Sequence, residues 1–88
     1  MSNIKLSPKA KSLKLGLYEH YKGGRYQVLG VAIHSETLEE LVIYKALYDE
    51  RLVWLRPLKM FLENVEVDGI KKPRFKYIGK EGEFTKHL

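Results

Sequence analysis

The chain of 88 residues is 44% hydrophobic and 31% charged, which suits one globular domain and excludes a two-domain enzyme. It has no cysteine, so disulfides, thiol catalysis and a cysteine-based zinc site are excluded. No stretch approaches the roughly 20 apolar residues of a membrane span, and the first residues lack the apolar core of a secretion signal. We therefore expect a soluble cytoplasmic protein with no membrane partner.

The formal net charge of +5 points toward nucleic acid, but the charges are unevenly placed along the chain. Residues 1–15 and 69–88 are basic, whereas residues 16–68 carry six basic against nine acidic side chains. A folded face that follows a phosphate backbone should be basic in this central part. We expect the basic ends to solubilise the chain and to add only weak, salt-sensitive affinity for RNA or DNA.

Residues 1–15 show no sustained apolar period, and we expect them to form a flexible basic leader. From Gly16 onward, aromatic and β-branched residues dominate, as is typical of strands. Lys22-Gly23-Gly24-Arg25 separates two such segments, residues 17–21 and 26–33, and paired glycines supply the positive φ of a tight connection. The two segments are therefore predicted to form a hairpin.

Residues 41–56 are predicted to form a second antiparallel hairpin, because two alternating apolar runs flank the polar turn Asp49-Glu50-Arg51. At Pro57 the apolar spacing becomes helical, which predicts one or two helical turns to about Glu63.

Beyond residue 64 the sequence predicts a further strand. Residues 65–67 alternate, and Asp68-Gly69 is a strong turn signal. Residues 70–75 are predicted to be an edge strand or extended arm, since Pro73 cannot donate to an interior ladder.

This order of elements follows the pattern of a small barrel. We expect a mainly β protein, a small Src-homology-3-like barrel of about five antiparallel strands with one short helical turn. Residues 16–78 are expected to form its single domain, and residues 79–88 a flexible tail.

Short motifs run through the whole expected fold: Gly16-x-Tyr18-x-His20-Tyr21-Lys22-Gly23, Tyr26-x-Val28-x-Gly30-x-Ala32, His34-Ser35-Glu36-Thr37, Val42-x-Tyr44, Leu47-Tyr48, Trp54-x-Arg56-Pro57, Met60-Phe61 and Pro73-Arg74-Phe75. Together they resemble the signature of the bacterial domain-of-unknown-function family 1653, with no departure at the signature positions. The resemblance implies a small, mainly bacterial, β-rich domain without an established activity.

Two histidines and one carboxylate are candidates for chemistry. His20 or His34 paired with Glu36 can act as an acid–base catalyst, and the three together can hold a metal. Alternatively, His20 is a packing residue within a strand and His34 begins a loop. A hydrolase triad is excluded for His34-Ser35-Glu36, because neighbours on an extended segment face opposite sides.

Arg56 offers a planar fork for a carboxylate or phosphate at the end of a strand. The alternative is an internal ion pair with Glu36 or Glu63. Six tyrosines, three phenylalanines and one tryptophan are more than a small barrel buries completely. Some tyrosines can therefore rim a groove for a peptide or for bases, or else form the core with their hydroxyls at the surface.

We expect a non-enzymatic binding module without metal or cofactor, whose polar-aromatic pocket holds an anionic or polar small ligand or a peptide. The alternatives are a small acid–base enzyme that uses a histidine with Glu36, and a nucleic-acid-binding accessory domain. The residues expected to form the pocket are Tyr18, His20, Tyr21, His34, Glu36, Tyr44 and Arg56.

Overall fold

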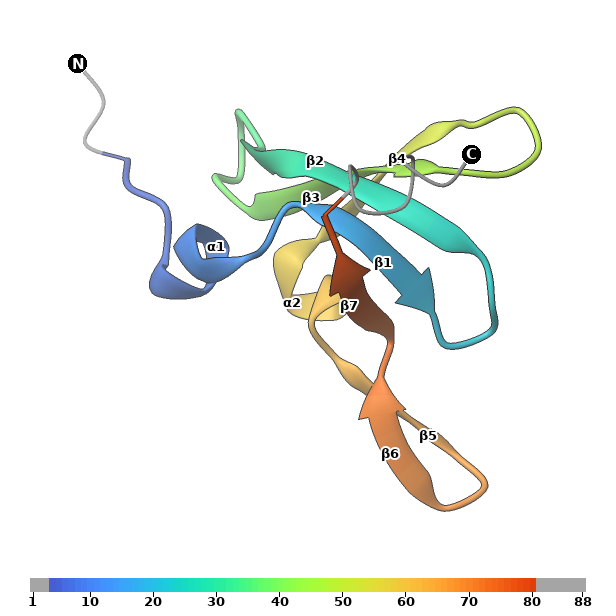
Figure 1. Cartoon of the computed structure of the whole chain (residues 1–88). Coiled ribbons are helices and arrows are strands. Elements are labelled where there is room, and N and C mark those ends of the chain that lie inside the picture. Colours follow the sequence, from blue (N-terminus) through green and yellow to red (C-terminus); the bar gives the residue numbers. More distant parts are fainter. Residues whose placement is uncertain (1–3, 81–88) are drawn as a thin grey trace.

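The strand composition that begins at Gly16 folds into antiparallel β structure in the computed structural model, which describes residues 4–80 (Figure 1). Its elements, in chain order, are α1 (Pro8–Ser12), β1 (Gly16–His20), β2 (Arg25–Ile33), β3 (Glu40–Ala46), β4 (Val53–Pro57), α2 (Leu58–Phe61), β5 (Asn64–Val67), β6 (Ile70–Pro73) and β7 (Phe75–Gly79). Neither helix of this described range has the length and apolarity needed to cross a membrane.

The main sheet has five antiparallel strands in the order β4-β3-β2-β1-β7 within the described chain. Its first hairpin turns where the sequence predicts it, at Gly23 and Gly24, whose φ angles are 96° and 81°. The second hairpin joins β3 to β4 with Tyr44 opposite Trp54, which confirms the antiparallel pairing predicted for residues 41–56. α2 begins directly after Pro57, as predicted.

The expectation of a closed barrel does not agree with the strand pairing. The edge strands β4 and β7 are not neighbours in the sheet of the described residues, so this sheet is open. The physical reason lies in β5 and β6, which pair with each other across the Asp68-Gly69 turn and form a separate hairpin that projects from the main sheet (Figure 1). The arm predicted at residues 70–75 is therefore divided, since Phe75 begins β7 and pairs with His20 of β1.

One face of the sheet carries the core, and both helices cover it. The buried residues that contact one another there are Ala10, Tyr18, Val28, Val42, Tyr44, Leu58, Phe61 and Phe75. Phe61 of α2 stacks on Phe75 of β7 with ring centroids 4.3 Å apart and planes 8° from parallel. The core is thus rich in aromatic rings, as the composition indicates.

The chain before β1 packs on the same core, which the sequence did not lead us to expect. Ala10 of α1 is buried, and Leu6 and Leu13 lie against the core cluster. The Tyr18 hydroxyl donates to the Lys14 carbonyl at 2.6 Å. The flexibility expected of residues 1–15 stays a prediction, and these contacts argue against it for residues 6–14. At the other end Gly79 belongs to β7 and Lys80 follows it, while residues 81–88 of the predicted tail lie outside the described residues.

Candidate functional site

Arg56 lies on the core face of the sheet, because its register partner on β3 is the buried Val42. Its Nε–H donates to the hydroxyl of Tyr44 at 3.2 Å, and its guanidinium lies 5.8 Å from the centre of the Phe75 ring. A phenol oxygen and an aromatic face thus fix the orientation of this half-buried cation without cancelling its charge.

Arg56 has no acidic partner among residues 4–80. Glu63 forms an ion pair with Arg74 at 3.3 Å, so its carboxylate has another partner. The alternative of an internal ion pair between Arg56 and Glu36 or Glu63 is therefore wrong. Among the described residues, no carboxylate neutralises the positive charge of Arg56.

His20 stands beside this cation at the end of β1. Its ring lies 4.9 Å from that of Phe75 and 4.7 Å from that of Tyr21, measured between centroids. Burial, followed by the positive charges of Arg56, Arg74 and Lys22, lowers the pKa of His20 below its ordinary value of 6.5.

At neutral pH the imidazole of His20 is therefore uncharged. Its Nδ1 accepts from the backbone N–H of Lys22 at 3.2 Å. A neutral imidazole whose Nδ1 accepts carries its proton on Nε2. His20 is thus a neutral hydrogen-bond donor in a positively charged environment.

Tyr26 and Phe75 complete the site, and neither was among the residues expected to form the pocket. Tyr26 meets Tyr44 and Phe75 edge to face, with centroids 5.4 and 5.7 Å apart, and its hydroxyl is hydrogen-bonded to that of Tyr48. Burial, together with the bond to Tyr48, raises the pKa of Tyr26 to about 12. The motifs at Tyr26 and at Phe75 were visible in the sequence, but only the strand register shows that they meet. We call His20, Tyr26, Tyr44, Arg56 and Phe75 the Arg56 cluster.

His34 and Glu36 do not belong to this cluster. They follow Ile33 at the end of β2, whereas Tyr26 lies near the start of that strand, about 23 Å away at the usual rise per residue. His34 Nδ1 accepts from the backbone N–H groups of Glu36 and Thr37 at 3.1 and 3.3 Å, which makes it a turn residue. The structure therefore does not bring the seven residues expected to share one pocket into one site, since His34 and Glu36 lie in the turn between β2 and β3.

Tyr18 and Tyr21 have different roles. Tyr18 is a core residue between Phe61 and Tyr77, with ring centroids 5.4 and 5.3 Å away. Its burial raises the pKa of the phenol to about 12. Tyr21 lines, with His20, a cavity of about 510 Å³ next to the end of β6.

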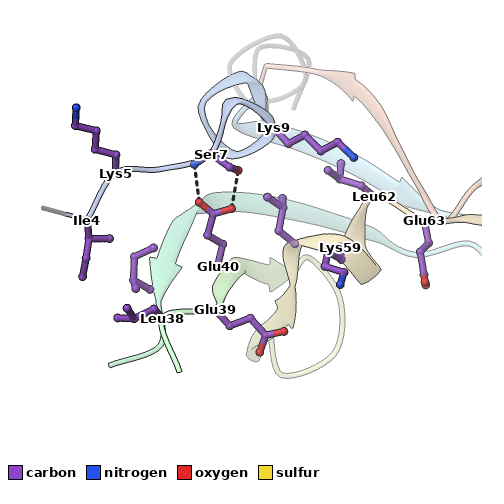
Figure 2. A pocket seen from close by; sticks show the side chains of 12 residues that line it. Ile4, Lys5, Ser7, Lys9, Leu38, Glu39, Glu40, Lys59, Leu62 and Glu63 are labelled. Carbon is purple, nitrogen blue, oxygen red and sulfur yellow. Dashed lines mark hydrogen bonds between the residues drawn. The ribbon is translucent and has the colours of Figure 1, made fainter. Parts of the chain in front are cut away.

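A cavity of about 740 Å³, shown in Figure 2, has no residue of the Arg56 cluster in its lining. It is bounded by the segment before α1, the turn before β3, and α2, and none of the expected pocket residues lines it. Its charged lining is balanced, with three lysines and three glutamates: Lys5, Lys9, Lys59, Glu39, Glu40 and Glu63. A cavity with balanced charge offers less attraction to an ion than Arg56, which has no acidic partner among the described residues.

The geometry gives little support to metal or acid–base chemistry. Within residues 4–80 no group of three histidine or acidic side chains is placed to hold a metal. In the same range no carboxylate comes within ion-pair distance of His20 or His34. The pairing of a histidine with Glu36, on which the enzyme alternative rests, is thus not formed.

The fold and the site define a small mainly β domain that holds an arginine among aromatic rings. A family model described as a protein of unknown function, DUF1653, matches residues 16–77, and the chain belongs to this family. The crystal structure of a protein from Bordetella bronchiseptica that also belongs to DUF1653 is similar, with 36% sequence identity and a TM-score of 0.75. That similarity covers 81% of this chain and 94% of the other. No curated protein matches. The resemblance found in the sequence is therefore confirmed.

Proposed function

We propose that this domain is a small binding module that holds the anionic group of a small ligand or peptide at the Arg56 cluster. The observation that carries the proposal is the half-buried Arg56, fixed by Tyr44 and Phe75 and without a carboxylate partner among residues 4–80. A buried charge is costly unless it is paired, so an external carboxylate or phosphate would relieve this cost.

The chemistry of the ligand follows from the donors that remain. Tyr44 occupies Nε of Arg56, which leaves the two terminal amino groups of the guanidinium for a ligand oxygen. Nearby, the buried Nε of Arg74 has no hydrogen-bond partner among the described residues, and its charge contributes to the field at His20. The rings of Tyr26, Tyr44 and Phe75 would favour a ligand with an apolar or aromatic part beside its anionic group.

Chemical-shift perturbation with two probes, inorganic phosphate and benzoate, tests this proposal. We expect both to shift the side-chain Nε–H of Arg56 and the rings of His20 and Phe75, with benzoate binding more tightly. Arg56→Ala should weaken binding by about 1.5–3 kcal/mol, the range for hydrogen bonds to charged groups. Lys71→Ala removes the same charge from the projecting β5–β6 hairpin and should bind like the parent.

A structural role for Arg56 would give a different result. Arg56→Ala would then lower the free energy of unfolding while neither probe shifted the cluster of the unaltered protein. That outcome would make the Arg56 cluster part of the scaffold and refute the proposed function.

A further inference from the structure

The exposed edge of the main sheet, strand β4, is unusually apolar. Leu52, Val53, Trp54 and Leu55 are consecutive, uncharged and 51%, 56%, 49% and 59% exposed. Natural proteins protect sheet edges with charges, prolines or bulges, since an unpaired strand is a template for another chain. The opposite edge, β7, has such a charge in the exposed Lys76, whereas Leu52 and the first three residues of β4 have none and Arg56 and Pro57 come only at the end of the strand.

The backbone of β4 shows which groups face outward. The Leu52 carbonyl accepts from the Ala46 N–H at 2.9 Å, so Leu52 directs its polar groups toward β3. Along an antiparallel strand, successive residues direct their backbone N–H and C=O groups to opposite sides. Trp54, which lies opposite Tyr44, therefore also faces β3, and Val53 and Leu55 direct their N–H and C=O groups away from the sheet.

We propose that a second copy of this chain pairs with β4 in an antiparallel, two-fold arrangement with Trp54 at the axis. Val53 of each copy then lies opposite Leu55 of the other. The two pairs form four backbone hydrogen bonds, which satisfy every outward N–H and C=O of Val53 and Leu55. The two five-stranded sheets become one continuous sheet.

Strand β4 is complementary to itself in this register, and shifted registers are less favourable. An axis at Leu55 would set Val53 opposite Pro57, which has no N–H to donate. An axis at Val53 would set Leu55 opposite Arg51, whose φ of 55° departs from an extended backbone. An axis between Val53 and Trp54 would oppose Arg51 to Arg56, two like charges.

The side chains of the Trp54 register also match. The two Trp54 rings face each other across the axis on the core side, where non-hydrogen-bonded pairs approach most closely. On the outer face Leu55 already lies beside Ile43, and Val53 of the second copy extends this apolar row. Arg56 lies opposite Leu52, so no like charges meet. This fit of the strand to itself favours a second copy over an unrelated peptide.

The concentration dependence of the unaltered protein tests the interface directly. Sedimentation velocity should show a dimer that dissociates on dilution, and the fluorescence of the single tryptophan should shift to the red over the same range. A monomer up to millimolar concentration would overturn the proposal. A dimer that dissociates without a change in Trp54 emission would overturn it as well.

A charge placed on the edge gives a matched pair of variants. Leu55→Lys should raise the dissociation constant at least about tenfold, since it sets a charge against Val53 of the second copy. Ile70→Lys makes the same change at a side chain that is 65% exposed on the β5–β6 hairpin and should not alter association. Equal effects of the two variants would contradict the interface.

Cysteine cross-linking tests the register, because the chain has no native cysteine. Trp54→Cys should form an intermolecular disulfide on mild oxidation, since opposite residues of a non-hydrogen-bonded pair have Cα atoms about 4.5 Å apart. Val53→Cys should link poorly, because its two copies are offset by two residues along the strands. Ile70→Cys measures random collision. Linking of Val53→Cys or Ile70→Cys as fast as that of Trp54→Cys would overturn the register.

Discussion

Ser7 holds the carboxylate of Glu40 with two hydrogen bonds, one from its backbone N–H and one from its hydroxyl, each 2.7 Å long (Figure 2). The same hydroxyl accepts from the Ala10 N–H at 3.1 Å and so caps α1. One side chain thus begins the helix and fastens it to the first residue of β3. This explains how a helix of five residues, too short to be stable alone, holds its place on the core.

Ser7→Ala should remove the cap and one of the two bonds to Glu40. We expect the free energy of unfolding to fall by about 0.5–2 kcal/mol, the usual cost of losing such a cap, and the amide of Ala10 to exchange faster. Urea denaturation and hydrogen exchange measure the two effects. Ser12→Ala is the control, because the exposed Ser12 hydroxyl bonds only the Lys9 carbonyl of its own helix. Equal losses in the two variants would contradict the anchoring role of Ser7.

The bonds from Ser7 also make the attachment of α1 dependent on pH. The side-chain bond and then the backbone bond hold the pKa of Glu40 below its ordinary value of 4.5. A carboxyl whose pKa is lower in the folded state contributes stability that is present above the unfolded pKa and is lost as the pH falls through the folded pKa. We therefore expect the protection of the Ala10 amide against hydrogen exchange to decrease as the pH falls below about 4.5. Glu40→Gln should abolish this dependence, and Glu39→Gln should retain it.

The hairpins could be predicted from the sequence because their signals are local. Gly23-Gly24 and Asp68-Gly69 specify turns by backbone conformation alone. The alternating runs on either side of Asp49-Glu50-Arg51 pair with each other, so this hairpin can be predicted without reference to distant parts of the chain. The barrel is not confirmed, and it could not be judged from the sequence because the choice of strand partner is not local. Residues 64–67 pair with 70–73 rather than with the main sheet, and nothing in their alternation distinguishes the two outcomes.

The residues that the structure gathers in the Arg56 cluster were predicted only in part for a related reason. His20, Tyr44 and Arg56 were recognisable by residue type, but their neighbours depend on register. A register shift between Val28 and Gly30 breaks the alternation of β2, so that Val28 and Val31 both reach the core. The sequence therefore gave no means of seeing that Tyr26 meets Phe75, or that His34 lies at the far end of β2.

The histidine of the cluster should report the charge of Arg56. Because burial and then Arg56 lower the pKa of His20, Arg56→Ala should raise it, and the removal of a distant charge by Lys71→Ala should leave it unchanged. An NMR titration of the imidazole protons measures the change. In the unaltered protein, phosphate bound at Arg56 should also raise the pKa of His20.

The sign of the stability effect follows from the same shift. A histidine with a lowered pKa contributes stability that is present above its unfolded pKa of about 6.5 and is lost as the pH falls through the folded pKa. Arg56→Ala should narrow the pH range between these two pKa values, because it raises the folded pKa of His20. A titration of His20 that is identical in the parent and in Arg56→Ala would show that the two groups do not interact.

The last prediction concerns the junction of β1 and β7. Gly16 has a φ of 129°, and a Cβ built on it would lie 2.7 Å from the carbonyl oxygen of Gly79. Both the strained backbone and the clash with main-chain atoms oppose a larger residue, so Gly16→Ala should destabilise the fold by about 1–3 kcal/mol. Gly30 is the matched control, since its Cβ would meet no atom within 4 Å and its φ is not positive. Gly30→Ala should be neutral or stabilising by up to about 1 kcal/mol in urea denaturation. A loss of stability for Gly16→Ala no larger than that for Gly30→Ala would mean that the backbone at the β1–β7 junction moves to accommodate a side chain.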